Sequence, residues 1–276
     1  MTELDIAGIG IWSPFFSNWQ AFCDGMNDGQ WQSEAQLRPG LIPARELRRS
    51  PQSVKMAVEV LSQACGMVKL DPAAMAVVFS SSMGDIQITD YLCRILAETP
   101  GLVSPTRFHN SVHNATTGYW SIASQAHAPT NAVSAYAYTA PMALFEAAVQ
   151  ALEEEAPVLV VCQEMAAPEA LHFACPSDQP FSMALLLTRP GYYAQAMASM
   201  RIDVHPGTVE WPELPGSLKA WFEGNFGARL LPLIAAMASV GSGSAPEGFS
   251  FEFPLSFRSV LGVSLNTVKP VGAAHA

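Results

Sequence analysis

Residues 157–162 (PVLVVC) and 181–188 (FSMALLLT) decide the fold class. Both runs are short and uncharged, and their apolar residues leave no polar face, which is typical of buried strands. Residues 4–12 (LDIAGIGIW) and 75–79 (MAVVF) resemble them, and apolar residues at helical spacing predict helices over 53–67 and 141–154. Strands that are apolar on both faces occur where helices cover both sides of a sheet. The alternation therefore predicts an α/β fold.

The other elements expected in the first 205 residues are shorter. They comprise a helix over 18–25, a solvated loop over 38–49, a helix over 86–96, a loop over 103–110, a buried helix over 111–125 and a strand over 130–134.

The end of the chain has a different character. Residues 206–216 are rich in proline, and 218–240 predicts one or two helices. Residues 241–244 (GSGS) form a flexible joint, after which 249–257 and 260–268 alternate as in an antiparallel hairpin with one wet face. We therefore divide the chain into a main domain over 1–205 and a carboxyl-terminal extension over 206–276 that packs on it.

The composition is apolar for a soluble protein, with 50% hydrophobic and only 14% charged residues. A membrane span or a large partner interface explains such a composition. The uncharged stretch 124–144 contains Pro129 and Pro141, and 230–240 has about half of the roughly 20 residues that a span needs. No basic segment followed by an apolar one opens the chain. We expect a cytoplasmic protein with no membrane span and a buried partner interface.

Charge and cysteine usage exclude several classes of function. A net charge of −10 repels phosphate, so we expect no nucleic acid partner. None of the five cysteines forms a CxxC pair, which indicates neither a disulfide framework nor a zinc site. Neither GxGxxG after a strand nor GxxxxGK[ST] is present, so we expect no nucleotide cofactor, and no other cofactor is indicated.

The residues taken alone do not present an active site. His109 and His113 have the spacing of one helix face, but no carboxylate nearby in sequence completes a metal site, so a polar patch is favoured. Ser80, Ser81 and Ser82 follow a predicted strand and could hold a nucleophile, although no GxSxG elbow accompanies them. The small, nearly chargeless residues over 111–138 indicate either an interface or simply the centre of the domain.

Several motifs together resemble one known family. Ser13-Pro14, Ser104-Pro105, Gly118-Tyr119 and 128–137 (APTNAVSAYA) are similar to the amino-terminal half of the β-ketoacyl synthase family, and the likeness covers roughly residues 4–189. It implies a thiolase-like α/β fold, with the amino-terminal half of a ketosynthase and a shortened carboxyl-terminal part. The motif over 107–123 (RFHNSVHNATTGYWSIA) resembles a short subfamily, the ketosynthase-like chain length factors of bacterial aryl-polyene biosynthesis.

The resemblance implies that the chain is catalytically silent. Active members carry a cysteine between the short strand and a buried helix, where the helix dipole favours the thiolate. Here that position is Ala137, and a methyl group cannot attack a thioester. The family's two catalytic histidines belong to the carboxyl-terminal half, whose motifs are absent from residues 206–276. Better-known chain length factors carry glutamine at the position of Ala137.

The resemblance also implies a partner. Ketosynthase folds dimerise through the short strand, so we expect a heterodimer with an active β-ketoacyl-ACP synthase and contact with the acidic acyl carrier protein only through that partner. The expected interface residues are Arg107, His113, Thr130, Asn131, Ala132, Val133, Ser134 and Tyr136. The residues expected to line the end of the partner's acyl tunnel are Met83, Phe108, Val112 and Thr116. A bulky tunnel end would limit product length in polyene, type II polyketide or fatty-acid-like biosynthesis.

Two other functions stay open at this point. Ser81 or Ser82 with His113 would make the protein an acyl-thioester hydrolase or decarboxylase. Alternatively, the chain is a homodimer that binds an acyl group in a vestigial pocket.

Overall fold

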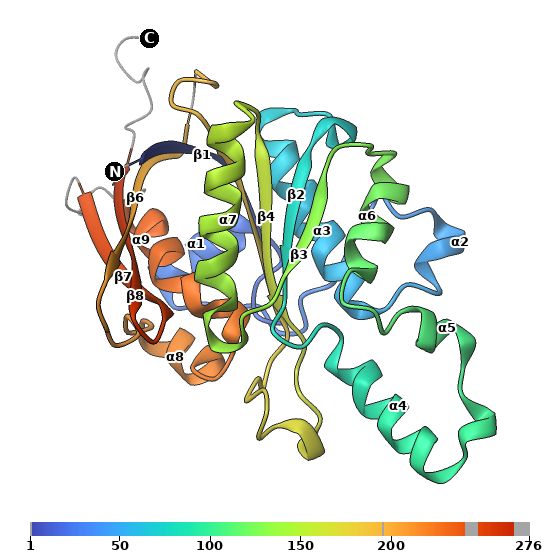
Figure 1. Cartoon of the computed structure of the whole chain (residues 1–276). Coiled ribbons are helices and arrows are strands. Elements are labelled where there is room, and N and C mark those ends of the chain that lie inside the picture. Colours follow the sequence, from blue (N-terminus) through green and yellow to red (C-terminus); the bar gives the residue numbers. More distant parts are fainter. Residues whose placement is uncertain (1, 195, 241–247, 268–276) are drawn as a thin grey trace.

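One mixed sheet of eight strands runs through the residues that the computed structural model describes, which are 2–194, 196–240 and 248–267 (Figure 1). The strand order is β3-β2-β4-β5-β1-β6-β8-β7. The strands are β1 (Thr2–Trp12), β2 (Ala76–Ser80), β3 (Thr130–Val133), β4 (Val158–Glu164), β5 (Phe181–Thr188), β6 (Ala198–Pro206), β7 (Gly248–Ser256) and β8 (Ser259–Thr267).

The apolar runs identified in the sequence form the centre of this sheet. Every residue of β2, β4 and β5 is buried, as their lack of a polar face predicts. β2 is parallel to β3 and β4, whereas β5 is antiparallel to β4 and β1. The predicted α/β class is therefore confirmed.

Helices cover both faces of the sheet. One face packs against α3 (Gln52–Val68) and Trp120 of α6 (Ala115–Ser124). The other face packs against α1 (Trp19–Asp28), α7 (Thr139–Glu153) and α9 (Leu231–Val240). The remaining helices are α2 (Ala44–Leu47), α4 (Ile86–Glu98), α5 (Pro105–His109) and α8 (Gly216–Phe222), with short 3₁₀ turns between some elements.

Two glycines of β1 let α3 approach the sheet closely. A Cβ on Gly10 would lie 1.9 Å from the carbonyl oxygen of Val60, and a Cβ on Gly8 would lie 2.4 Å from that of Ala64. Both distances are far below van der Waals contact, so only glycine fits at these two positions.

The carboxyl-terminal strands continue the same sheet. β6 pairs with β1 and with β8, and β7 pairs with β8 as the predicted antiparallel hairpin. The hairpin contacts α7 and α9, so these helices lie between it and the centre of the sheet (Figure 1). The strand over 198–206 was not predicted, although β6 alternates buried and partly exposed residues as the hairpin does. The joint at 241–244 lies outside the described residues, and the division at 205/206 stays a prediction.

Three local predictions were wrong. The loops expected over 38–49 and 103–110 contain the short helices α2 and α5. The helix expected over 111–125 begins only at Ala115 and is not buried all round, since Ile122 is 73% exposed. His109 ends α5 and His113 precedes α6, so the two histidines do not share a helix face.

Candidate functional site

The turn between β3 and α7 is the position that the family resemblance assigns to the cysteine of active ketosynthases, and this assignment stays a prediction. It consists of a 3₁₀ turn over Tyr136–Tyr138 that leads directly into α7. Tyr136 has a left-handed backbone (φ 52°), which is uncommon for a bulky residue and marks the sharpest point of the turn. Ala137 follows it and is half-buried. Residues 134–139 (SAYAYT) contain no cysteine, so an alignment shifted by one position would also leave the turn without a thiol.

Aromatic rings surround this turn. The ring of Tyr136 packs edge-on against Phe226 at 4.9 Å, and that of Tyr138 stacks on Trp211 at 6.1 Å. The guanidinium of Arg229 lies over the ring of Trp211 at 4.6 Å, and desolvation lowers its pKa. Rings and an arginine therefore occupy the space beside the turn.

A buried polar cluster lies next to the turn, at the carboxyl ends of β2 and β4. Glu164, the last residue of β4, is fully buried and accepts hydrogen bonds from the backbone N–H groups of Ser82 and Met83. The hydroxyl of Ser81 lies 3.1 Å from Glu164 Oε2. Burial raises the pKa of Glu164 to about 7, because desolvation outweighs the hydrogen bonds that favour the carboxylate.

Protonation of Glu164 completes the hydrogen bonds of this cluster. The Ser81 hydroxyl lies within reach of two acceptors, Glu164 Oε2 at 3.1 Å and the carbonyl oxygen of Gly84 at 3.2 Å, but it has only one hydrogen to donate. A protonated Glu164 can donate to Ser81, which then donates to Gly84. Glu164 thus holds the loop over 81–84 in place in either protonation state.

His113 Nε2 is not paired with the hydroxyl of Ser81 or Ser82. His113 Nε2 lies 2.8 Å from the backbone carbonyl oxygen of Ser81, and since a carbonyl only accepts, this nitrogen donates. A nitrogen in that role cannot accept a proton from a serine hydroxyl. The hydroxyl of Ser82 faces the sulfur of Cys175 at 3.9 Å. The geometry gives the hydrolase alternative no support.

The buried cysteines near this cluster are not activated. Burial raises the pKa of Cys162 to about 12 and that of Cys175 to about 11, so both are neutral thiols near pH 7. Cys162 lies on β4 and belongs to the core of the sheet.

The expected tunnel residues fall into two groups. Phe108 and Val112 are 64% and 54% exposed, on and just after α5. Thr116 is buried in the first turn of α6, and Met83 is half-buried in the loop held by Glu164. His113 connects the groups, because its ring contacts Gly84 and the carbonyl of Ser81. Their lining of a partner's tunnel stays a prediction.

Strand β3 has one open edge among the described residues, since it ends the strand order. Val77 donates its N–H to the carbonyl of Pro129 at 3.1 Å. This bond determines which residues of β3 direct their backbone groups toward β2 and which direct them to the open side. The backbone groups of Asn131 then face β2, whereas those of Thr130 and Ala132 face the open side. An open row of this kind is a template for another strand.

The other residues expected at an interface make contacts within the chain. Ser134 Oγ donates to the carbonyl of Ser82 at 2.9 Å, and Arg107 lies 4.0 Å above the ring of Tyr91. These contacts leave their interface roles untested.

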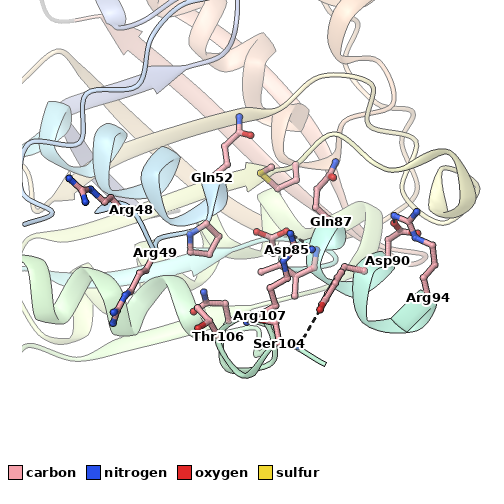
Figure 2. A pocket seen from close by; sticks show the side chains of 15 residues that line it. Arg48, Arg49, Gln52, Asp85, Gln87, Asp90, Arg94, Ser104, Thr106 and Arg107 are labelled. Carbon is pink, nitrogen blue, oxygen red and sulfur yellow. Dashed lines mark hydrogen bonds and ion pairs between the residues drawn. The ribbon is translucent and has the colours of Figure 1, made fainter. Parts of the chain in front are cut away.

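An arginine-lined cleft of about 700 Å³ lies between the amino end of α3 and the helices α4 and α5 (Figure 2). Four of the fourteen basic residues line it, namely Arg48, Arg49, Arg94 and Arg107. Asp90 pairs with Arg94, and Tyr91 accepts from the backbone N–H of Ser104 at 3.2 Å, which joins α4 to α5. The arginines come from three separate segments, so sequence patterns did not reveal the cleft. Asp85 also lines the cleft, so four arginines and two aspartates contribute to its lining.

Two kinds of site are missing from the described part of the chain. It contains no group of three or more histidine, cysteine or acidic side chains placed to bind a metal ion. It also contains no helix that is both long and apolar enough to span a bilayer.

Several solved structures have a fold similar to that of this chain. The chain resembles a structure of a ketosynthase in complex with its chain length factor from Xenorhabdus doucetiae, at 22% identity and a TM-score of 0.67, over 96% of this chain and 100% of that one. It also resembles the ishigamide ketosynthase/chain length factor, at 14% identity and a TM-score of 0.75, over 98% of this chain and 100% of that one.

A third similar structure is a type II polyketide synthase acyl-carrier protein in complex with its ketosynthase bound to the hexaketide, at 11% identity and a TM-score of 0.74, over 97% of this chain and 100% of that one. No curated protein matches the chain. The thiolase-like fold implied by the sequence is thus confirmed. A family model described as the N-terminal domain of β-ketoacyl synthase matches residues 19–219, most of the chain, and the protein therefore belongs to the β-ketoacyl synthase family.

Proposed function

We propose that this protein is a catalytically silent chain length factor that pairs with an active β-ketoacyl-ACP synthase. The observation that supports this most directly is the turn between β3 and α7. It keeps the strand-turn-helix form on which a ketosynthase places its nucleophile, but it has Tyr136 and Ala137 and no thiol. The neighbouring thiols of Cys162 and Cys175 are buried and neutral, so neither substitutes for it.

The open edge of β3 supports a partner. Thr130 and Ala132 direct their backbone groups to the open side, and a strand of a second subunit would bond to them. Exposed apolar side chains lie on the neighbouring helices, among them Phe108 of α5 and Ile122 of α6. Two of the similar structures are described as ketosynthase with chain length factor, which agrees with a ketosynthase as the partner.

In this proposal the protein limits product length through the end of the partner's tunnel. Phe108 and Val112 are exposed on the chain alone and become buried against the partner, while Met83 and Thr116 lie deeper. The acyl carrier protein then meets the complex through the catalytic subunit. Aryl-polyene biosynthesis, as the pathway, rests on the motif over 107–123 alone. The cytoplasm stays the expected compartment.

Co-expression with the catalytic ketosynthase encoded nearest to this chain tests the proposal. A tag on either protein is used for affinity purification, and the mass of the complex is measured in solution. A stoichiometric complex, together with no acyl-thioester turnover by this chain alone, supports the proposal. A stable, homogeneous protein that does not bind the ketosynthase would contradict the proposal. Turnover by the isolated chain would favour a hydrolase or decarboxylase. Acyl chains that co-purify with a homodimer would favour the acyl-binding alternative.

A further inference from the structure

The segment that forms the open sheet edge is devoid of basic side chains. Residues 108–188 contain neither lysine nor arginine, although they contain seven aspartates and glutamates. This segment includes β3 and the two helices beside it, α6 and α7, none of which contains a histidine. A strand that pairs with β3 therefore meets no lysine or arginine from α6, β3 or α7, and the nearest histidine in the sequence is the exposed His127 before β3.

One carboxylate of this surface is held directly beside the edge strand. Glu146 of α7 is half-buried, and its Oε1 accepts from Asn131 Nδ2 on β3 and from Gln150 Nε2, both at 3.0 Å. Both donors are neutral amides, so the negative charge is positioned without being balanced. The other amide atom of Asn131, Oδ1, is buried and has no hydrogen-bond partner in the described structure. This oxygen is covered by the chain itself, so Glu146 is the group at this position that a partner can meet.

Self-pairing at this edge would bring the acidic groups together. Antiparallel pairing of β3 with its own copy about a two-fold axis places both α7 helices on the same face of the joined sheet. Each Glu146 would then approach the other with no lysine, arginine or histidine from α6, β3 or α7 of either copy. Like charges at a partly dehydrated contact repel one another and suppress the wrong pairing.

We propose that Glu146 makes this edge select a different chain over a second copy. The partner that fits places a lysine, arginine or histidine side chain opposite Glu146, where it neutralises the carboxylate. This inference rests on the proposed function, because it concerns the same edge and assigns the chemistry of the partner's side chain.

The test compares Glu146→Gln with Glu153→Gln. Glutamine keeps an acceptor for Asn131 and removes only the charge. Glu153 is exposed and lies two turns further along α7, so it serves as the matched control. Self-association of each chain is measured by sedimentation velocity. Affinity for the catalytic ketosynthase encoded nearest to this chain is measured at about 50 mM and about 500 mM salt.

We expect Glu146→Gln to weaken the complex with the ketosynthase by about tenfold at low salt and to remove most of its salt dependence. It should strengthen self-association by a similar factor, while Glu153→Gln behaves like the wild type. Unchanged ketosynthase affinity, salt dependence and self-association in Glu146→Gln would overturn the inference.

The two proposals fail differently. If the wild-type chain does not bind the ketosynthase at all, the proposed function fails, and the self-association of Glu146→Gln still tests the repulsion. If the wild type binds and Glu146→Gln binds equally well, only the present inference fails. Thermal unfolding checks that the variant is folded. Should it be unstable, a wild-type complex that does not weaken with salt contradicts a charge pair at this edge.

Discussion

Ser134 donates a hydrogen bond from its side chain to the backbone carbonyl of Ser82 across 2.9 Å. The contact joins the turn between β3 and α7 to the loop after β2, which Glu164 holds from the other side. This loop contains Met83, one of the residues proposed to lie near the acyl tunnel. The rigidity of the loop therefore depends on a buried acid, and the pH dependence of stability should reveal it.

Glu164 should make the protein less stable as the pH rises. Its pKa is raised from 4.5 to about 7 in the folded state, so the folded protein binds this proton more tightly than the unfolded chain. The stabilisation is complete below about pH 4.5, decreases as the pH rises to about 7, and is then constant. It amounts to on the order of 3 kcal/mol. Urea unfolding at several pH values should show this decrease in the wild type relative to Glu164→Gln.

The control for that experiment is Glu169→Gln, an exposed glutamate of the following loop. Its unfolding free energy should follow the wild type at every pH. A constant difference between wild type and Glu164→Gln over the whole range would show that Glu164 does not bind its proton more tightly on folding.

Replacement of Gly10 by alanine should destabilise the protein strongly. The added Cβ would lie 1.9 Å from the carbonyl oxygen of Val60, so either β1 or α3 must move. We expect a loss of about 3 kcal/mol or more in the free energy of unfolding, measured by urea denaturation.

Gly66 provides the opposite case on the same pair of elements. It lies in α3 with open space around its Cα, so Gly66→Ala should stabilise the protein by up to about 1 kcal/mol. Equal effects of the two substitutions would contradict the close approach of α3 to β1.

Ala132→Pro should separate partner binding from folding. The N–H of Ala132 faces the open side of β3, so proline removes a bond to the partner and none to β2. We expect the affinity for the ketosynthase to fall by at least about tenfold with little change in the melting temperature. Asn131→Pro, which removes an N–H that faces β2, should instead lower the melting temperature. Binding that survives Ala132→Pro would exclude pairing through this edge.

Enlargement of Val112 should shorten the product of the complex. Val112 is 54% exposed on the chain alone, so Val112→Trp should leave its fold intact and fill space only against the partner. A shorter product in mass spectrometry of the reconstituted synthase is expected, since overpacking a closed tunnel end by a few methylenes costs on the order of 1–3 kcal/mol.

Val204→Trp is the control, at a 44% exposed position on β6, away from β3 in the strand order. It should leave product length unchanged. If Val112→Trp binds the ketosynthase and yields the wild-type length, Val112 does not line the tunnel.

Sequence patterns predicted the buried strands and the carboxyl-terminal hairpin, but not every strand. β4 and β5 are buried throughout, and their apolar runs identified them. β6 was missed although its apolar residues alternate with polar ones in the same way as those of the hairpin. The helix α5 was missed because it is short, although Ser104 and Pro105 formed a recognisable start, with the Ser104 side chain accepting from Arg107 N.

The candidate site was only partly accessible to sequence reasoning. The assignment of Ala137 to the nucleophile position came from the family resemblance, whose motif there is local in the chain, and it stays a prediction. The role of Glu164 did not, because its partner Ser82 lies 82 residues away. Its one signal was an acidic residue at the end of an otherwise apolar strand. The arginine cleft combines three separated segments and left no local pattern.

The place of β1 in the sheet determines the order of events during synthesis. Thr2–Trp12 is synthesised before the other described strands, yet it pairs only with β5 and β6, which begin at Phe181 and Ala198. Its apolar side chains therefore have no strand to join until those two strands have been made. During this interval they are exposed to aggregation, and the edge at β3 can recruit a partner onto a completed sheet only after the later strands have been made.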